Sequence, residues 1–381
     1  MKPLDGIRIV DITASLAGPT CTQLLGALGA EVVKVEPPEG DHARAWGPPF
    51  IAASVDGEAD DARPVHPDAD GAGRDRMGAL FFAANAGKRS VVLELREERE
   101  KLLELVAAAD VLVLSLRPGL AEELGLAADD LRERNPRLIH CTIGAYGRGG
   151  PLSDRPGYDP LMQAAAGIMS VTGEPDGPPV RVGISLIDFA TGQWAAIGIL
   201  AALLERERTG AGCTIDTSLY ESALYAMSPH VAAYESSGDV PGRYGSAFPL
   251  IAPYELFPTS DGAVMISAGS DALWERLRGA LGLADDERFR TNPDRVAHRT
   301  ELFETIAAVL RTATSADWEE RLTAAGVPVS PVRDLGEALA HPQTEALGIL
   351  QQLGNGTTVS LPLRFDGERP RYSSAPPTLG H

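Results

Sequence analysis

The chain has 381 residues, 44% of them hydrophobic and 23% charged, a composition typical of a globular protein too long for one hydrophobic core. Its formal net charge of -19 argues against a nucleic-acid partner, because phosphates are bound by basic surfaces. No segment is predicted to span a membrane, and the three cysteines have neither metal-ligand nor disulfide spacing. We therefore expect a cytoplasmic protein with no metal site and no membrane partner.

The first 150 residues alternate short apolar strands with helices. A strand at 7–12 leads through a Gly-Pro turn into a helix at 20–29 and a second strand at 31–36. The same alternation continues in strands at 88–95, 110–116 and 137–147 and in helices at 96–109 and 126–136. Such alternation is typical of parallel sheets, so we predict a doubly wound, Rossmann-like α/β domain with ligands at the carboxyl ends of its strands.

Two later features complete this domain. Residues 51–77 are rich in Asp, Ala, Gly and Pro and have little apolar periodicity, which predicts an exposed insertion. Residues 193–207 form a long apolar helix that is closed by charged residues, so we expect it to be buried against the domain.

The pattern changes after residue 225. Residues 254–269 predict an antiparallel hairpin that turns at Ser260-Asp261-Gly262, and helices follow at 271–282, 298–314 and 317–326. We therefore predict a small α+β domain at 225–327, a large α/β domain made of 1–205 and 328–381, and a connecting segment at 206–224. Glu255, on the hairpin, is expected to be a solvated acid.

No common catalytic motif marks the chain. The P-loop, the zinc-protease helix and the serine-hydrolase elbow are absent, and the early turn ASLAGPT lacks the three-glycine dinucleotide fingerprint. One carboxylate, Asp188, stands in the apolar run RVGISLIDFATG immediately before the predicted helix. A desolvated carboxylate can attack an acyl group if N–H donors stabilise the oxyanion. An aspartate at a helix start is more commonly an N-cap, however, and the residues alone favour the cap.

Long stretches of the chain resemble the class III CoA-transferases. This family contains the formyl-CoA, carnitine and bile-acid CoA-transferases and also the α-methylacyl-CoA racemases. The stretches run nearly end to end and include PLDGIRIVDIT, AGPTCTQLLGALGAEVVKVEPPEGD, NAGKRSVVLEL, NPRLIHCTIGAYGRGGP, RPGYDPLMQAAAG and AGVPVSPV. The resemblance implies the family's α/β fold and its interlocked homodimer.

The resemblance also implies a reaction. CoA would pass from an acyl-CoA donor to a carboxylic acid, with Asp188 as the nucleophile that forms anhydride and aspartyl-CoA thioester intermediates. CoA and acyl-CoA would be substrates, and no cofactor would be tightly bound.

The positions that match the family's CoA and acyl contacts mostly follow predicted strands. The cations among them would hold phosphates or be ordinary solvated cations. Tyr158 would line the acyl pocket or pack in the core, and Asp159 would orient a loop or a substrate group. The full set is Ser15, Leu16, Ala17, Arg44, Asn85, Lys88, Arg89, Ser115, Leu116, Arg117, Tyr146, Tyr158 and Asp159.

Two alternatives stay open at this point. A racemase would need the histidine of the family's Gly-His-Asp motif, but this chain has Gly157-Tyr158-Asp159, and tyrosine is a poor base near neutral pH. His140, inside a strand, is expected to be a core residue. A non-catalytic CoA-binding homologue is the other alternative. Leu16, where the formyl-CoA branch has glutamine, argues against oxalate and formate as substrates.

Overall fold

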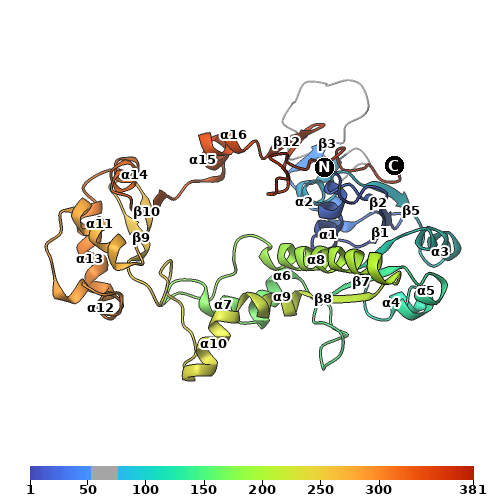
Figure 1. Cartoon of the computed structure of the whole chain (residues 1–381), viewed down its shortest axis with the longest axis horizontal. Coiled ribbons are helices and arrows are strands. Elements are labelled where there is room, and N and C mark those ends of the chain that lie inside the picture. The colour runs from blue at the N-terminus through green and yellow to red at the C-terminus, as the bar shows by residue number, and fades with distance from the viewer. Residues whose placement is uncertain (53–75) are drawn as a thin grey trace. The chain divides into compact units, whose positions relative to one another are not determined.

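The computed structural model describes residues 1–52 and 76–381, so most of the predicted insertion at 51–77 lies outside the described residues. The chain divides into two compact units (Figure 1). The large unit contains residues 1–168, 182–236 and 344–381, and the small unit contains residues 169–181 and 237–343.

The large unit is built on a six-stranded parallel sheet with the order β5-β2-β1-β6-β7-β8. Its strands are β1 (Arg8–Ile12), β2 (Glu31–Glu36), β5 (Arg89–Val92), β6 (Val111–Leu114), β7 (Ile139–Gly144) and β8 (Thr214–Ser218). In chain order this is 3-2-1-4-5-6, the order of the dinucleotide-binding doubly wound folds. The order reverses between β1 and β6, and ligands of such sheets bind outside the strands' carboxyl ends at this point.

Both faces of the sheet are covered, which explains why its strands are continuously apolar. Alternate strand residues enter different cores: Ile9 and Val32 pack with α1 (Ala17–Ala27) and α8 (Leu186–Thr209) on one face. Val10 and Leu112 pack with α3 (Arg99–Ala107) and α5 (Ala128–Arg134) on the other. The remaining elements of this unit, or at its boundary, are η1 (His42–Ala45), β3 (Phe50–Ala52), β4 (Arg76–Gly78), α2 (Ala79–Ala84), α4 (Leu120–Glu123), α6 (Asp159–Ala165), α7 (Ile168–Val171), α9 (Leu219–Ala226), α10 (Ser228–Ser237), α16 (Pro342–Leu347), β12 (Leu350–Leu353) and β13 (Gly356–Val359).

Helices α1 and α8 pack with their backbones close together (Figure 1). A Cβ added at Gly192 of α8 would lie 2.5 Å from the carbonyl oxygen of Ala17, the first residue of α1, so only glycine allows this approach. In the described part of the chain, α8 alone is long and apolar enough to span a membrane, a test that packed core helices also pass. Its extent, 186–209, corrects the predicted helix start at 193.

The small unit has its own core around an antiparallel sheet of order β11-β10-β9. The predicted hairpin is confirmed by β9 (Tyr254–Pro258) and β10 (Ala263–Ser267), and β11 (Val329–Pro331) pairs with β10. The helices of this unit are α11 (Asp271–Leu281), η2 (Glu287–Phe289), α12 (Asn292–Ala297), α13 (Arg299–Leu310), α14 (Ser315–Ala324) and α15 (Leu335–Ala340).

The division of the chain differs from the predicted boundaries. The predicted connecting segment, 206–224, contains β8, the edge strand of the large sheet. The small unit starts at residue 237 instead of 225, extends to residue 343, and also includes residues 169–181. No local pattern predicts that last inclusion, because it depends on contacts between distant parts of the chain.

Candidate active site

The loop after β1 lies at the point where the strand order reverses. The N–H of Ala14 donates to the Oγ of Ser115, which follows β6, at 3.1 Å, so the two loops are joined across the crevice. Ser15 has a φ of 68°, a left-handed conformation that costs energy for a residue with a Cβ. It is held by Asp41 and His42, which follow β2: its N–H donates to the Asp41 carboxylate at 3.2 Å, and its Oγ lies 2.7 Å from Nε2 of His42.

The start of α1 presents unoccupied donors to this crevice. Its N-cap residue, Leu16, makes no side-chain capping bond, and the first turn contains no acid. Among the described residues, nothing accepts from the N–H groups of Leu16, Ala17 or Gly18. The buried hydroxyl of Thr20, one turn further along, has no partner either. A helix N-terminus with free N–H groups attracts negative charge, which suits an oxyanion.

Asp188 lies in the first turn of α8. Because α8 leads directly into the parallel strand β8, its start lies at the carboxyl edge of the sheet. Gly192, which touches Ala17, is one helical turn further along the same face, so the close approach brings the starts of α1 and α8 together.

Asp159, at the start of α6, caps α8 from outside the helix. Its carboxylate accepts from the N–H of Ile187 at 2.7 Å and from that of Asp188 at 3.3 Å. The amide of Gln163 donates to the other Asp159 oxygen at 2.6 Å, so this buried carboxylate is fully engaged. The N-cap residue of α8 is Ser185, whose side chain does not cap the helix. The cap hypothesis for Asp188 is therefore wrong: Asp188 is the third helical residue, and Asp159 does the capping.

The surroundings of Asp188 disfavour its charge. Burial, followed by the nearby Asp159 carboxylate, raises the pKa of Asp188 from 3.8 to about 7. Among the described residues no cation opposes this shift. A half-buried carboxylate that is poorly solvated and unpaired is a stronger nucleophile than a solvated one, and such groups cluster at functional sites.

Three residues predicted to hold CoA are instead buried in an ionic network: Asn85, Lys88 and Arg44. The Lys88 ammonium donates to Asp11 at 3.0 Å, to the Pro19 carbonyl at 3.0 Å and to Asn85 at 2.8 Å, so all three of its donors are used. Lys88 and Asn85 therefore support the loop from within, and the Lys88 ammonium has no donor left for a phosphate.

Arg44 belongs to the same buried layer. Its guanidinium donates to both carboxylate oxygens of Glu36, at 2.8 and 2.6 Å, and to the carbonyl of Pro377. It also lies 3.8 Å from the centre of the Phe81 ring. Arg44 is thus packed as a structural residue between β2, α2 and the C-terminal segment.

The other predicted residues lie in several places. Arg117 is exposed in the loop after β6 and pairs loosely with Glu123 at 3.4 Å, and Leu116 beside it is half-buried. Arg89 is exposed at the amino end of β5. Tyr146 follows β7 and contacts the ring of Tyr220. Tyr158 is 54% exposed, so it does not pack in the core.

Two other expectations can be compared with the structure. His140 is confirmed as a core residue, with Nε2 2.9 Å from the Leu126 carbonyl and a pKa lowered by burial. Glu255 was expected to be solvated, but it is buried against Arg299 at 3.3 Å, and burial raises its pKa.

Sequence reasoning missed His42 and Gln163. His42 follows a strand at the carboxyl edge of the sheet, and that position could have suggested it. Gln163 gave no local signal, because its partners Asp159 and Val182 are recognised only once the helices pack.

A Rossmann-type sheet with a poorly solvated carboxylate beside two helix starts suits acyl transfer, and comparison with known proteins defines the class. Residues 4–381 match the model of CoA-transferase family III, so the chain belongs to this family. It is an acyl-CoA:carboxylate CoA-transferase, which moves CoA between acyl groups.

Individual relatives match over almost the whole chain. A succinate–glutarate CoA-transferase of Agrobacterium fabrum is 39% identical, with 99% of this chain and 93% of the relative covered. A succinyl-CoA:glutarate CoA-transferase of Mus musculus is 35% identical and covers 100% of this chain and 84% of its own. The crystal structure of a CAIB/BAIF family protein from Brucella suis matches with a TM-score of 0.86 at 38% identity, covering 99% of this chain and 96% of that one.

Proposed function

We propose that Asp188 is the nucleophile of this CoA-transferase and that its substrates are succinyl-CoA and a second dicarboxylic acid such as glutarate. The raised pKa of Asp188 beside two helix starts supports the first part. The second part rests on the similarity to the Agrobacterium fabrum and Mus musculus proteins, whose names give succinyl and glutarate substrates.

The reaction consists of four acyl exchanges without a net proton transfer. An Asp188 oxygen attacks the donor thioester carbon, the C–S bond breaks, and CoA thiolate leaves a mixed anhydride. The thiolate attacks the Asp188 carbonyl and releases the donor acid, which gives an aspartyl-CoA thioester. The acceptor carboxylate then displaces the thiolate to form a second anhydride. The thiolate finally attacks the acceptor acyl carbon, forms the new acyl-CoA and frees Asp188.

Each exchange passes through a tetrahedral oxyanion. The free N–H groups of Leu16, Ala17 and Gly18 lie at the start of α1, beside the face of α8 that carries Asp188. We assign the stabilisation of the oxyanion to these donors, which are fixed by the backbone and need no reorganisation during the reaction.

We further propose that CoA lies along the carboxyl edge of the sheet. Ser15, Ser115, Leu116 and Tyr146 would contact its pantetheine and adenine groups, and the exposed guanidinium of Arg117 would contact phosphate. Arg89 is exposed but stands at the amino end of β5, away from this edge, and Lys88 is buried, so neither is assigned to the phosphates.

The contacts of Asp159 argue against racemisation. Exchange of an α-proton needs a base that can accept a proton, and both Asp159 oxygens already accept hydrogen bonds from Gln163 and the start of α8. Tyr158 offers only a phenol. In deuterated water without an acceptor acid, we expect no α-deuterium in a 2-methylacyl-CoA, as measured by mass spectrometry. Exchange without transfer would overturn this assignment.

We also propose that the enzyme is a homodimer whose chains interlock, as the family resemblance implies. Apolar side chains exposed on α8 to α10 provide a surface for a second copy, among them Ile197 at 53%, Leu204 at 71% and Tyr225 at 64% exposure. Light scattering on the purified chain should give twice the monomer mass. For Leu204→Glu the measured mass should fall toward that of the monomer. A wild-type monomer would contradict the proposal.

The pH dependence of the reaction should report Asp188. Only the carboxylate attacks, so kcat/KM for the acyl-CoA donor should rise tenfold per pH unit below about 7 and level off above it. Asp159→Asn keeps an acceptor oxygen for the cap but removes the negative charge that helps to raise the pKa of Asp188. In this variant the rise of kcat/KM should therefore occur at lower pH. A profile that is flat from pH 5 to 8 would exclude Asp188 as the titrating nucleophile.

The covalent intermediates give the direct test. After incubation with succinyl-CoA, intact-mass analysis should show an aspartyl-CoA adduct, and hydroxylamine should trap the activated carboxyl as a hydroxamate at Asp188. Asp188→Asn should show neither product, whereas Asp129→Asn, on the exposed side of α5, should behave like the wild type. Turnover by an adduct-free Asp188→Ala enzyme would overturn the mechanism.

A further inference from the structure

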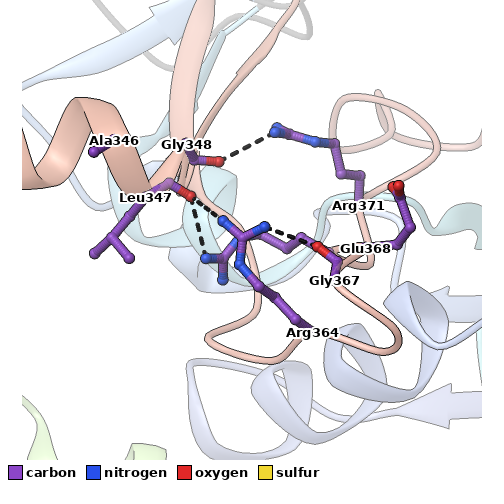
Figure 2. Close-up of a pocket in the computed structure, with 8 residues that line it drawn as sticks. Ala346, Leu347, Gly348, Arg364, Gly367, Glu368 and Arg371 are labelled. Atoms are coloured by element: carbon purple, nitrogen blue, oxygen red, sulfur yellow. Dashed lines mark hydrogen bonds between the residues drawn. The ribbon is translucent and has the colours of Figure 1, made fainter.

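A second candidate binding site lies where the chain returns to the large unit. A cavity of about 310 Å³ is lined by the side chains of Arg364, Arg369, Arg371 and Glu368 and by the backbone of Leu347 and Gly348 (Figure 2). We call it the arginine pocket. None of its residues belongs to the candidate active site.

The three guanidiniums of the arginine pocket bind only neutral partners. Arg364 donates to the carbonyl of Leu347 at 2.7 Å (Figure 2). Arg369 donates to the same oxygen at 3.3 Å. Arg371 donates to the carbonyl of Gly348 at 3.1 Å. Within residues 1–52 and 76–381, no carboxylate forms an ion pair with any of the three.

Among the described residues these three arginines lie close together without a carboxylate partner, although the chain as a whole is acidic. Some arginines elsewhere pair with acids, as Arg333 does with Glu319 at 2.8 Å and Arg288 with Asp286 at 2.7 Å, whereas Arg243 donates to backbone carbonyls. Three neighbouring cations repel one another, and a carbonyl compensates a guanidinium less well than an anion does. The pocket therefore has an uncompensated positive charge.

Hydrogen-bond donors also remain in the arginine pocket. Each guanidinium has five N–H groups, and each of these three uses two of them, one on each terminal nitrogen, on carbonyl oxygens. In the part of the chain that the structure describes, the buried Nε of Arg369 has no partner. Guanidinium groups match the oxygens of phosphate in paired hydrogen bonds, and donors from three side chains suit a tetrahedral group better than a planar carboxylate.

We propose that the arginine pocket binds a phosphate-type dianion. Three guanidiniums and the Glu368 carboxylate leave two net positive charges, which a dianion neutralises. The bound group also strengthens the attachment of the segment that follows α16, because the same arginines hold the carbonyls of Leu347 and Gly348. The phosphate comes either from the free ion or from a phosphorylated ligand such as CoA.

The test is titration calorimetry of the full chain with inorganic phosphate, in chloride buffer at constant ionic strength. We expect saturable binding at one site that Arg364→Gln and Arg371→Gln each weaken at least tenfold. Arg311→Gln, an exposed arginine of the small unit, is the matched control and should change nothing. Absence of saturable binding, or equal binding by the glutamine variants, would overturn the proposal.

Two further measurements separate a lost site from a lost fold. Arg371→Lys keeps the charge and should retain more phosphate binding than Arg371→Gln, while circular dichroism and the unfolding temperature without phosphate should match in the two variants. If Arg371→Lys and Arg371→Gln both lose binding and both give an unfolded spectrum, phosphate binding by Arg364→Gln decides whether the pocket is the site. Asp188→Asn should bind phosphate normally, so failure of the proposed chemistry and failure of this site are distinguishable.

A comparison of ligands identifies the source of the phosphate. If Arg371→Gln weakens CoA binding but not binding of 3′-dephospho-CoA, the pocket holds the 3′-phosphate of CoA. If it weakens inorganic phosphate alone, the pocket holds the free ion. If it weakens none of the three ligands, the arginine pocket is not an anion site.

Discussion

Asp188→Asn is expected to lower kcat for CoA transfer from succinyl-CoA by about 10³-fold or more, because an amide cannot form the anhydride that carries the acyl group. KM for the donor should change little, since the proposed CoA contacts lie on the loops after β1 and β6. Initial rates measured with both substrates varied would show the loss. Residual activity within tenfold of the wild type would exclude covalent catalysis by this residue.

Asp188→Asn should also fold, and the pH dependence of its stability can test this. Burial raises the pKa of Asp188 to about 7, so the folded state holds a proton that the unfolded state releases near pH 3.8. Ionising Asp188 therefore costs stability progressively as pH rises from about 4 to 7. Asp188→Asn removes this cost and should raise the unfolding temperature at pH 8 but not at pH 4. A lower unfolding temperature at pH 8 would indicate a damaged fold.

Lys88→Met is expected to lower the free energy of unfolding by about 3–5 kcal/mol, because it leaves the buried Asp11 carboxylate without its ion-pair partner. Burial by itself would raise the pKa of Asp11, but Lys88 and Lys34 lower it to about 2, which shows how strongly the charged form depends on them. Urea unfolding followed by circular dichroism measures the change.

The chain provides a matched control for that substitution. Lys101 also pairs with a carboxylate, that of Glu98 at 2.6 Å, but this pair is on the surface, so Lys101→Met should cause little change. The double variant Asp11→Leu with Lys88→Met should recover part of the lost stability, because no buried charge then remains unpaired. Equal effects of Lys88→Met and Lys101→Met would contradict the structural role assigned to Lys88.

The strands and helices of the first 150 residues could be predicted because each carries its own periodic signal. Strand β2, EVVKVE, has three buried valines and also buries Lys34 and Glu36, and β6, VLVL, is wholly apolar. Strand β8, TIDTS, was missed because it is a polar edge strand with no such period. Glycines at 183 and 192 similarly hid the true start of α8, which begins at Leu186.

The site could be predicted only in part, because its geometry depends on distant residues. The resemblance singled out Asp188, but the cap from Asp159, 29 positions earlier, exists only after α6 and α8 pack. Lys88 and Arg44 look in the sequence like solvated cations near phosphate. The register that pairs β2 with β5 instead surrounds them with Asp11 and Glu36.

The contact between Gly192 and Ala17 separates the chemistry of this enzyme from its choice of substrate. Two helices whose backbones touch cannot slide independently, so Asp188, the proposed nucleophile, and the N–H donors at the start of α1 keep one spacing whichever acyl group is bound. Side chains that line the acyl pocket can then be replaced by others without disturbing the reacting groups. Divergence toward new acids within one fold is compatible with this contact as long as position 192 remains glycine.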